Sequence, residues 1–122
     1  MEKMDEIVKL SLLYDFYGEL LTEHQKSICE DYFFNDIGLS EIAEERGTSR
    51  QAVHDMVKRI EKLLLGYEAK LHLVERFIKT KDTIKQVKGY IDELVSFENV
   101  SEDERIIIDK IGKLSEHILD EL

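Results

Sequence analysis

Near the middle of the chain, six polar side chains that could contact nucleic acid fall within 13 residues. They are Arg50, Gln51, His54, Lys58, Arg59 and Lys62. Arginine can donate hydrogen bonds to guanine and glutamine can bridge adenine, so Arg50 and Gln51 suit base edges. Arg59 and Lys62 suit phosphates, which cationic side chains bind without reading sequence. A helix that carries these residues would turn Arg50, Gln51, His54, Asp55 and Lys58 outward in its first turns.

These side chains need a scaffold that presents one helix to a partner. The residues before them have the pattern of two helices that cross steeply through a short turn. Ala43 is small where the first helix would touch the second, and Gly47, four residues later, tolerates positive φ. Ser49 can cap the second helix, and Val53 can anchor it. The pattern predicts a helix from Leu39 to about Arg46 and a second helix that begins after Ser49.

Helical spacing of apolar residues extends to both sides of this pair. Residues 5–21 form an amphipathic pattern with Ile7, Leu10, Leu13, Tyr14, Tyr17, Leu20 and Leu21 on one face. Thr22 and Gln25 then form a reciprocal cap for a helix that ends near residues 35–38. The helix that begins after Ser49 can continue past Leu65, because Gly66 costs only about 1 kcal/mol inside a helix.

The second half of the chain has three apolar seams with coiled-coil spacing. They are Tyr67, Leu71, Val74 and Ile78; then Ile84, Val87, Ile91 and Leu94; and finally Ile107, Ile111, Leu114 and Ile118. The first two seams are out of phase, which predicts a break or a rotation of face at residues 79–82. Residues 96–100 read as a loop, and residues 101–104 form a capping box for the last helix.

The chain contains no proline and no alternating strand pattern, so the expected class is all-α. The expected domains are a helix-turn-helix domain at residues 1–66 and a C-terminal helical region at residues 67–122. The single Cys29 suits a reducing compartment and a buried position on a helix. The N-terminus has no signal-peptide pattern, and no apolar run is long enough to span a membrane. We expect a cytoplasmic protein without membrane insertion.

The net charge of −10 is unusual for a protein that binds nucleic acid, which normally carries a basic surface. Residues 1–66 hold 14 acids against 8 bases, and residues 67–122 hold 13 against 9. The exception is residues 46–62, with five bases against Asp55 and Glu61. Positive charge is therefore concentrated where the recognition helix is expected.

No constellation typical of an enzyme is present. The four histidines do not pair at the spacing of metal ligands, and His72 with Glu68 and Glu75 reads as a solvated ion-pair group. The sequence lacks a glycine-rich phosphate loop, a serine elbow and a cysteine–histidine pair. We expect no catalysis, no cofactor, no metal site and no small-molecule substrate.

Three segments resemble region 4 of sigma-70-type factors: Leu21-Thr22-Glu23-His24-Gln25, Leu39-Ser40-Glu41-Ile42-Ala43 and Ser49-Arg50-Gln51-Ala52-Val53. Residues 55–63 and 12–17 narrow the resemblance to the YlxM family of small bacterial helix-turn-helix proteins. The resemblance to the YlxM family is close over residues 5–78. The resemblance implies a regulatory or accessory role in the signal recognition particle pathway, with the particle's proteins or RNA as partners.

Three functions remain open from the sequence. The chain can be a regulator that binds DNA or signal recognition particle RNA through the helix after Ser49. It can be a protein adaptor whose acidic C-terminal helices bind a basic partner, or a purely dimeric structural element. The apolar seams predict a homodimer through residues 67–122, with a hairpin of the last two helices within one chain as the alternative.

Overall fold

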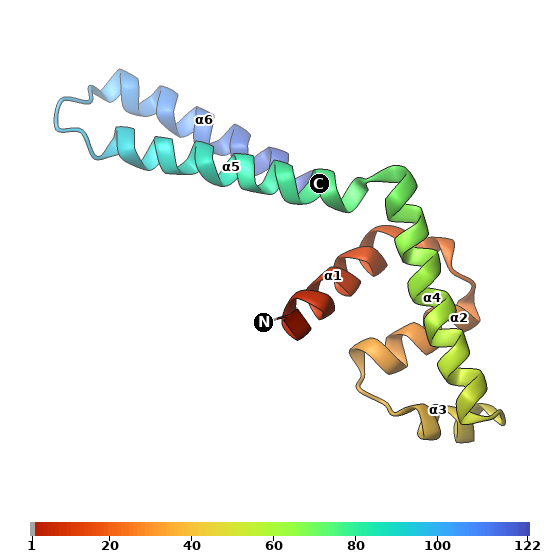
Figure 1. Ribbon diagram of the computed structural model, residues 1–122. Helices are drawn as coiled ribbons and strands as arrows, with labels where there is room; N and C mark the ends of the chain where they lie inside the picture. Colours follow the sequence, from red (N-terminus) through yellow and green to blue (C-terminus); the bar gives the residue numbers. More distant parts are fainter. Residues whose placement is uncertain (1) are drawn as a thin grey trace. The chain divides into compact units, whose positions relative to one another are not determined.

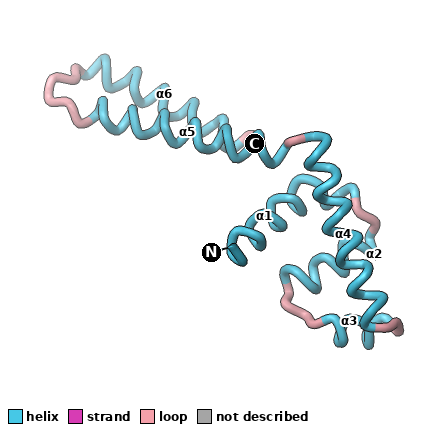
Figure 2. The backbone as a smooth tube through the Cα atoms, viewed as in Figure 1, coloured by secondary structure: helices cyan, strands magenta, loops and turns pink. Residues whose placement is uncertain are grey.

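The computed structural model describes the backbone of residues 2–122 and the side chains of residues 6–122 (Figures 1 and 2). Every regular element among these residues is helical, which confirms the all-α class. In chain order they are α1 (Glu2–Tyr17), the 3-10 turn η1 (Gly18–Leu20), α2 (Glu23–Cys29), the π-helical turn η2 (Glu30–Phe34), α3 (Leu39–Arg46), α4 (Arg50–Leu71), α5 (Leu73–Val95) and α6 (Glu102–Asp120).

The chain forms two compact units, Met1–Val74 and Glu75–Leu122. The expected domain boundary after residue 66 falls inside α4, because Gly66 is accommodated as an ordinary helical residue. The helix ends instead at His72, which has the left-handed φ and ψ of 57° and 28°. The first unit therefore takes in the whole of α4 and the first two residues of α5.

Helix α4 is the centre of the first unit, and α1, α2 and α3 all pack against it. The apolar positions of α4 that face this core are Val53, Val57, Ile60 and Leu64, each at most 2% exposed. They meet buried side chains from the other helices, namely Leu13, Tyr17, Leu21, Ile28, Cys29, Leu39, Ile42 and Ala43. Two residues expected on the inner face of the first helix, Ile7 and Leu20, are instead 56% exposed.

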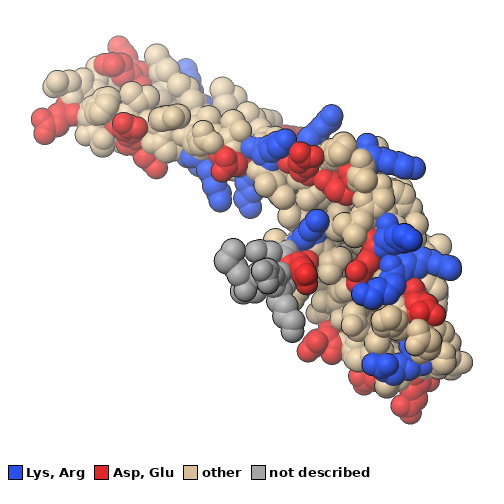
Figure 3. Space-filling view, viewed as in Figure 1, with Lys and Arg blue, Asp and Glu red and all other residues tan. Residues whose placement is uncertain are grey.

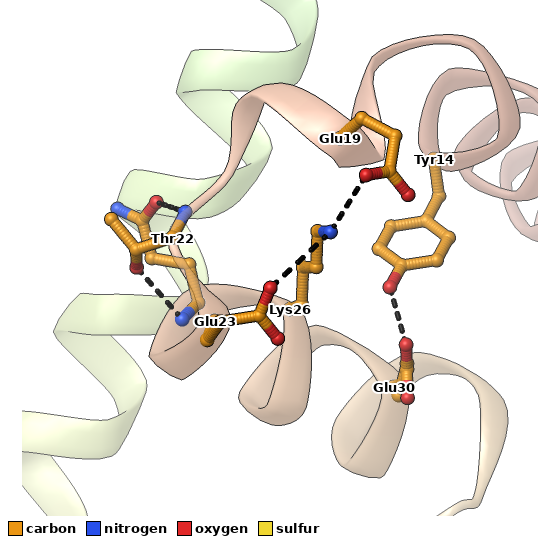
Figure 4. Close-up of polar contacts among 7 residues, drawn as sticks. Tyr14, Glu19, Thr22, Glu23, Lys26 and Glu30 are labelled. Atoms are coloured by element: carbon orange, nitrogen blue, oxygen red, sulfur yellow. Dashed lines mark hydrogen bonds and ion pairs between the residues drawn. The ribbon is translucent and has the colours of Figure 1, made fainter.

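The start of α2 has the predicted capping box (Figure 4). The Thr22 hydroxyl accepts from the Gln25 amide at 3.1 Å, and the Gln25 side chain accepts from the Thr22 amide at 3.0 Å. Beside it, Lys26 forms ion pairs with Glu19 at 3.0 Å and Glu23 at 3.6 Å. These contacts fix the turn between α1 and α2 with residues that are close in sequence.

Tyr17 connects the end of α1 to the junction of α4 and α5. Its hydroxyl donates to Glu68 Oε1 at 2.5 Å and accepts from the Leu73 amide at 3.1 Å. Glu68 Oε1 also accepts from the Val74 amide at 3.0 Å. The first two amides of α5 lack helical partners of their own. Tyr17 and Glu68 supply these partners, so a buried phenol caps the helix that follows α4.

The second unit is an antiparallel hairpin of α5 and α6, which lie side by side in Figures 1 and 2. The last two helices therefore pair as a hairpin within one chain, which is the alternative that the sequence left open. Ile84 and Ile108 are its buried hydrophobic residues, at 5% and 9% exposure, and Lys88 forms an ion pair with Glu116. The loop after Val95 and the capping box of Ser101 and Glu104 are as predicted.

The break predicted at residues 79–82 is wrong, because α5 is continuous across them. The seam that faces α6 passes through Phe77, Thr80 and Ile84, not through Ile78, which is 52% exposed. This spacing of three and four residues keeps one face toward α6 without a rotation.

Alkaline pH should destabilise the first unit. Burial raises the pKa of the Cys29 thiol to about 11, and burial together with hydrogen bonds to Glu30 and Glu68 raises the pKa of Tyr14 and Tyr17. In the unfolded chain these groups ionise near their ordinary pKa values, about 8.5 for cysteine and 10 for tyrosine. Above about pH 9 the unfolded state therefore binds fewer protons, and the free energy of unfolding falls as pH rises.

Thermal melts at pH 7, 9 and 10.5 measure this effect. We expect an unchanged midpoint up to about pH 8 and a progressive decrease above it. The Cys29→Ala variant serves as a control, since it should lose the part of the decrease that comes from the thiol. A midpoint that stays constant to pH 10.5 would contradict the burial of these three groups.

Candidate nucleic-acid interface

The turn between α3 and α4 has the geometry that the sequence predicts. Gly47 ends α3 in the left-handed region at φ 64°, and the Thr48 amide donates to the Ala43 carbonyl at 3.0 Å. The Ser49 hydroxyl accepts from the Ala52 amide at 3.0 Å and caps α4. Ala43 and Val53 are 5% and 1% exposed. The two helices are therefore fixed to one another by a glycine turn, a serine cap and a small-residue contact.

The six expected contact residues all lie in the first 13 residues of α4. Five of them are exposed, and His54 is partly buried. Gln51, Lys58 and Lys62 follow one another at steps of seven and four residues, so they share one line along the helix. Arg59 lies to one side of this line, and Arg50 and His54 lie to the other. This part of α4 is about 18 Å long and presents a helix of a width that fits the major groove.

The four cations in this part of α4 are called the basic row and are available to a ligand. Among the residues that the structure describes, Arg50, Lys58, Arg59 and Lys62 form no ion pair with a carboxylate. Figure 3 shows Lys and Arg side chains gathered along α4 in the first unit. Unpaired cations can release the counterions of a phosphate backbone without first giving up a protein carboxylate.

Asp55 places one carboxylate within the basic row. Its Oδ1 atom accepts from the Gln51 side-chain amide at 2.9 Å and lies 3.8 Å from Nδ1 of His54. The bond holds Gln51 in one orientation and leaves its carbonyl and its second N–H free for a base edge. Asp55 itself would repel phosphate, so it favours a base-facing position for this part of α4.

Arg46 belongs to the same basic segment of the sequence but has a structural role. Its Nη2 atom donates to Ser27 Oγ at 2.6 Å and to Asp31 Oδ2 at 3.0 Å, and its side chain is 22% exposed. These bonds tie the end of α3 to α2 and η2. No local pattern predicts this role of Arg46, because Ser27 and Asp31 lie 19 and 15 residues away.

A second basic segment, which the sequence analysis missed, lies in the hairpin unit. Residues 76–88 hold Arg76, Lys79, Lys81, Lys85 and Lys88 against one acid, Asp82. Three of these bases are engaged within their own unit: Lys79 with Glu75 at 3.0 Å, Lys88 with Glu116, and Lys81 over the Phe77 ring at 5.8 Å. Because most cations of residues 76–88 already have partners, whereas those of the α4 row do not pair with described carboxylates, α4 is favoured as the surface for an anionic ligand.

In the part of the chain that the structure describes, no group of three or more His, Cys, Asp or Glu residues is placed to hold a metal ion. None of the described helices is both long enough and apolar enough to span a bilayer.

A glycine-ended helix, a capped second helix that packs against it, and the buried Ala43 and Val53 together define a helix-turn-helix protein. The family model described as "Putative helix-turn-helix protein, YlxM / p13 like" (UPF0122) matches residues 4–111, and the chain belongs to this family.

Relatives of similar length support the assignment. A UPF0122 protein of Clostridium kluyveri is 44% identical over 108 residues, which cover 88% of this chain and 93% of the relative. One from Clostridium acetobutylicum is 42% identical over 114 residues, covering 90% and 94%. One from Bacillus cereus is 38% identical over 111 residues, covering 91% and 98%.

Proposed function

We propose that this protein binds nucleic acid through the first turns of α4. The observation that carries the proposal is the row of exposed cations, none of which pairs with a carboxylate of residues 6–122, and the oriented Gln51 at the start of the second helix of a helix-turn-helix. Arg50, Gln51, His54 and Lys58 contact base edges, and Arg59 and Lys62 contact phosphates. Membership of the YlxM family suggests signal recognition particle RNA as the first ligand to test, with a regulatory or accessory role in protein targeting.

Salt dependence of binding tests this proposal. We expect the logarithm of the association constant for RNA or DNA to fall with the logarithm of salt concentration at a slope near −0.7 to −0.9 for each phosphate contacted. The two phosphate contacts of Arg59 and Lys62 give a total slope of about −1.4 to −1.8. The Lys62→Ala variant should lower the magnitude of the slope by about one unit, whereas Lys85→Ala on α5 should leave it unchanged.

Binding that shows no salt dependence, or equal changes in the two variants, would exclude phosphate contact by α4. The measurement uses fluorescence anisotropy with labelled signal recognition particle RNA, and a labelled DNA duplex in parallel. A steep slope with only one of the two polymers identifies which one α4 recognises.

A protein–protein adaptor is the second candidate function. Residues 92–104 carry six acids and no base, namely Asp92, Glu93, Glu98, Glu102, Asp103 and Glu104. Acidic side chains gather at the loop end of the hairpin in Figure 3. Such a surface suits a basic protein, including a protein of the signal recognition particle. Partner binding that survives nuclease treatment and the loss of the α4 cations would favour the adaptor.

We also propose that the protein acts as a homodimer. An acidic chain with a single short basic row binds a polyanion weakly, and two rows in one assembly gain effective concentration.

A further inference from the structure

The hairpin unit buries little of its own apolar surface. Over residues 75–122, Ile84 and Ile108 are the buried hydrophobic side chains, and Ser115 is buried beside them. A unit of 48 residues is below the size at which one core normally supplies enough stability, and such units commonly gain it by association. Five more apolar side chains are only partly buried, namely Phe77, Val87, Ile91, Val100 and Leu119, and the other large apolar side chains of the hairpin are exposed.

The apolar seam of α6 is exposed along its whole length. Ile107, Ile111, Leu114 and Ile118 are 57%, 43%, 65% and 46% exposed. The residues that face α5 are Ile108, Gly112, Ser115 and Leu119, which lie about a quarter of a turn away around the helix. The seam that the sequence predicts to be covered is therefore not covered by α5.

Helix α5 extends the same apolar face. Tyr90 and Leu94 are 66% and 43% exposed, and they lie about a quarter of a turn from the line of Ile84 and Ile91. Since the two helices are antiparallel, these residues and the α6 seam are on one side of the hairpin. The ion pair of Lys88 and Glu116 marks the opposite, charged side. The hairpin thus has one apolar face and one charged face.

We propose that two copies of this chain pack through these apolar faces and form a four-helix bundle. The α6 seam is self-complementary, because a two-fold axis between Ile111 and Leu114 brings Ile107 of one copy against Ile118 of the other. Such an isologous contact closes after two copies. Four-helix bundles are built from antiparallel pairs that share an apolar core in this way.

The size of the face agrees with a specific dimer. Helix α6 is about 28 Å long at 1.5 Å per residue, and two helices 8–10 Å apart make a face about 18 Å wide. Each copy then contributes on the order of 500 Å², and the pair buries about 1,000 Å², the area above which interfaces are specific. The net charge of −10 per chain opposes association, so salt should strengthen the dimer.

This inference names the surface of the proposed homodimer, and its test uses no nucleic acid. Sedimentation equilibrium of the full chain at 5–100 µM protein should give twice the chain mass of 14.3 kDa. The dissociation constant should decrease when NaCl is raised from 0.1 to 0.5 M, which is opposite to binding of a basic partner. Leu114→Glu should give a monomer with an unchanged helical circular-dichroism spectrum.

Lys85→Ala is the matched control, because it changes the net charge by the same −1 on the charged side of the hairpin. It should remain a dimer. Ile107→Gln is a second variant in case Leu114→Glu fails to fold, and it should weaken the dimer at least tenfold. A monomeric wild-type chain at 100 µM, or a Leu114→Glu variant that folds and stays dimeric, would overturn the proposal.

Discussion

Replacing Arg50, Gln51 and Lys58 together with alanine should abolish binding of nucleic acid while the fold stays intact. Each bidentate base contact contributes about 1–3 kcal/mol of discrimination. Loss of the base contacts of Arg50, Gln51 and Lys58 should therefore lower the affinity by a factor on the order of 100 or more. The three side chains are exposed, so the melting temperature should change little. Anisotropy titration and a thermal melt of the same sample measure both effects.

The control for this variant removes the same positive charge elsewhere. Lys81→Ala with Lys85→Ala on α5 also removes two cations, and it should leave the affinity within about threefold of wild type if screening at 0.15 M salt is effective. If the two variants lose affinity equally, binding depends on net charge and not on the recognition helix. If neither variant loses affinity, the adaptor function gains support.

The Ala43→Leu variant should unfold or severely loosen the first unit. Ala43 is 5% exposed where α3 crosses α4, beside Ile42 and Val53, which are 0% and 1% exposed. Added methylene groups at a close-packed crossing cost about 1–3 kcal/mol or more. For a unit of this size, that cost corresponds to a decrease in melting temperature of roughly 4–8 °C per kcal/mol.

Glu44→Leu is the matched control for this substitution. It introduces the same side chain one residue later, at an exposed position of α3, and should leave the melting temperature within a few degrees of wild type. Circular dichroism at 222 nm during heating measures both variants. A melting temperature of Ala43→Leu equal to that of Glu44→Leu would be inconsistent with a close helix crossing at Ala43.

The parts of the fold that local chemistry determines were predictable from sequence. The caps at Thr22, Ser49 and Ser101 and the left-handed Gly47 depend on residues within four positions of one another. The helix that follows each cap then follows from apolar spacing. The start of α4 and the exposed positions of its first turns were predictable for the same reason.

What depends on distant residues was not predictable. The first unit extends to Val74 because Tyr17 and Glu68, 51 residues apart, supply partners for the first amides of α5. The Gln51–Asp55 bond is a choice of rotamer, which spacing allows but does not require. On α6 the pattern contains two adjacent apolar lines, and only the packing of α5 decides that Ile108 is covered and Ile107 is exposed.

The bond network of Tyr17 also has a consequence for how the chain folds during its synthesis. The hydrogen bonds of the Tyr17 hydroxyl cannot form until Glu68 and Leu73 have been synthesised, and these residues follow Tyr17 by 51 and 56 positions. At roughly 5–20 residues per second, ribosomes need about 3–11 s to make that length of chain. For more than half of that interval, until residue 50 is made, the apolar side of α1, with Leu13 and Tyr17, has no part of α4 to pack against, and α4 is complete only at Leu71. The N-terminal helix-turn-helix unit therefore closes late in translation, when its last turn of helix has left the ribosome, and not progressively as each helix emerges.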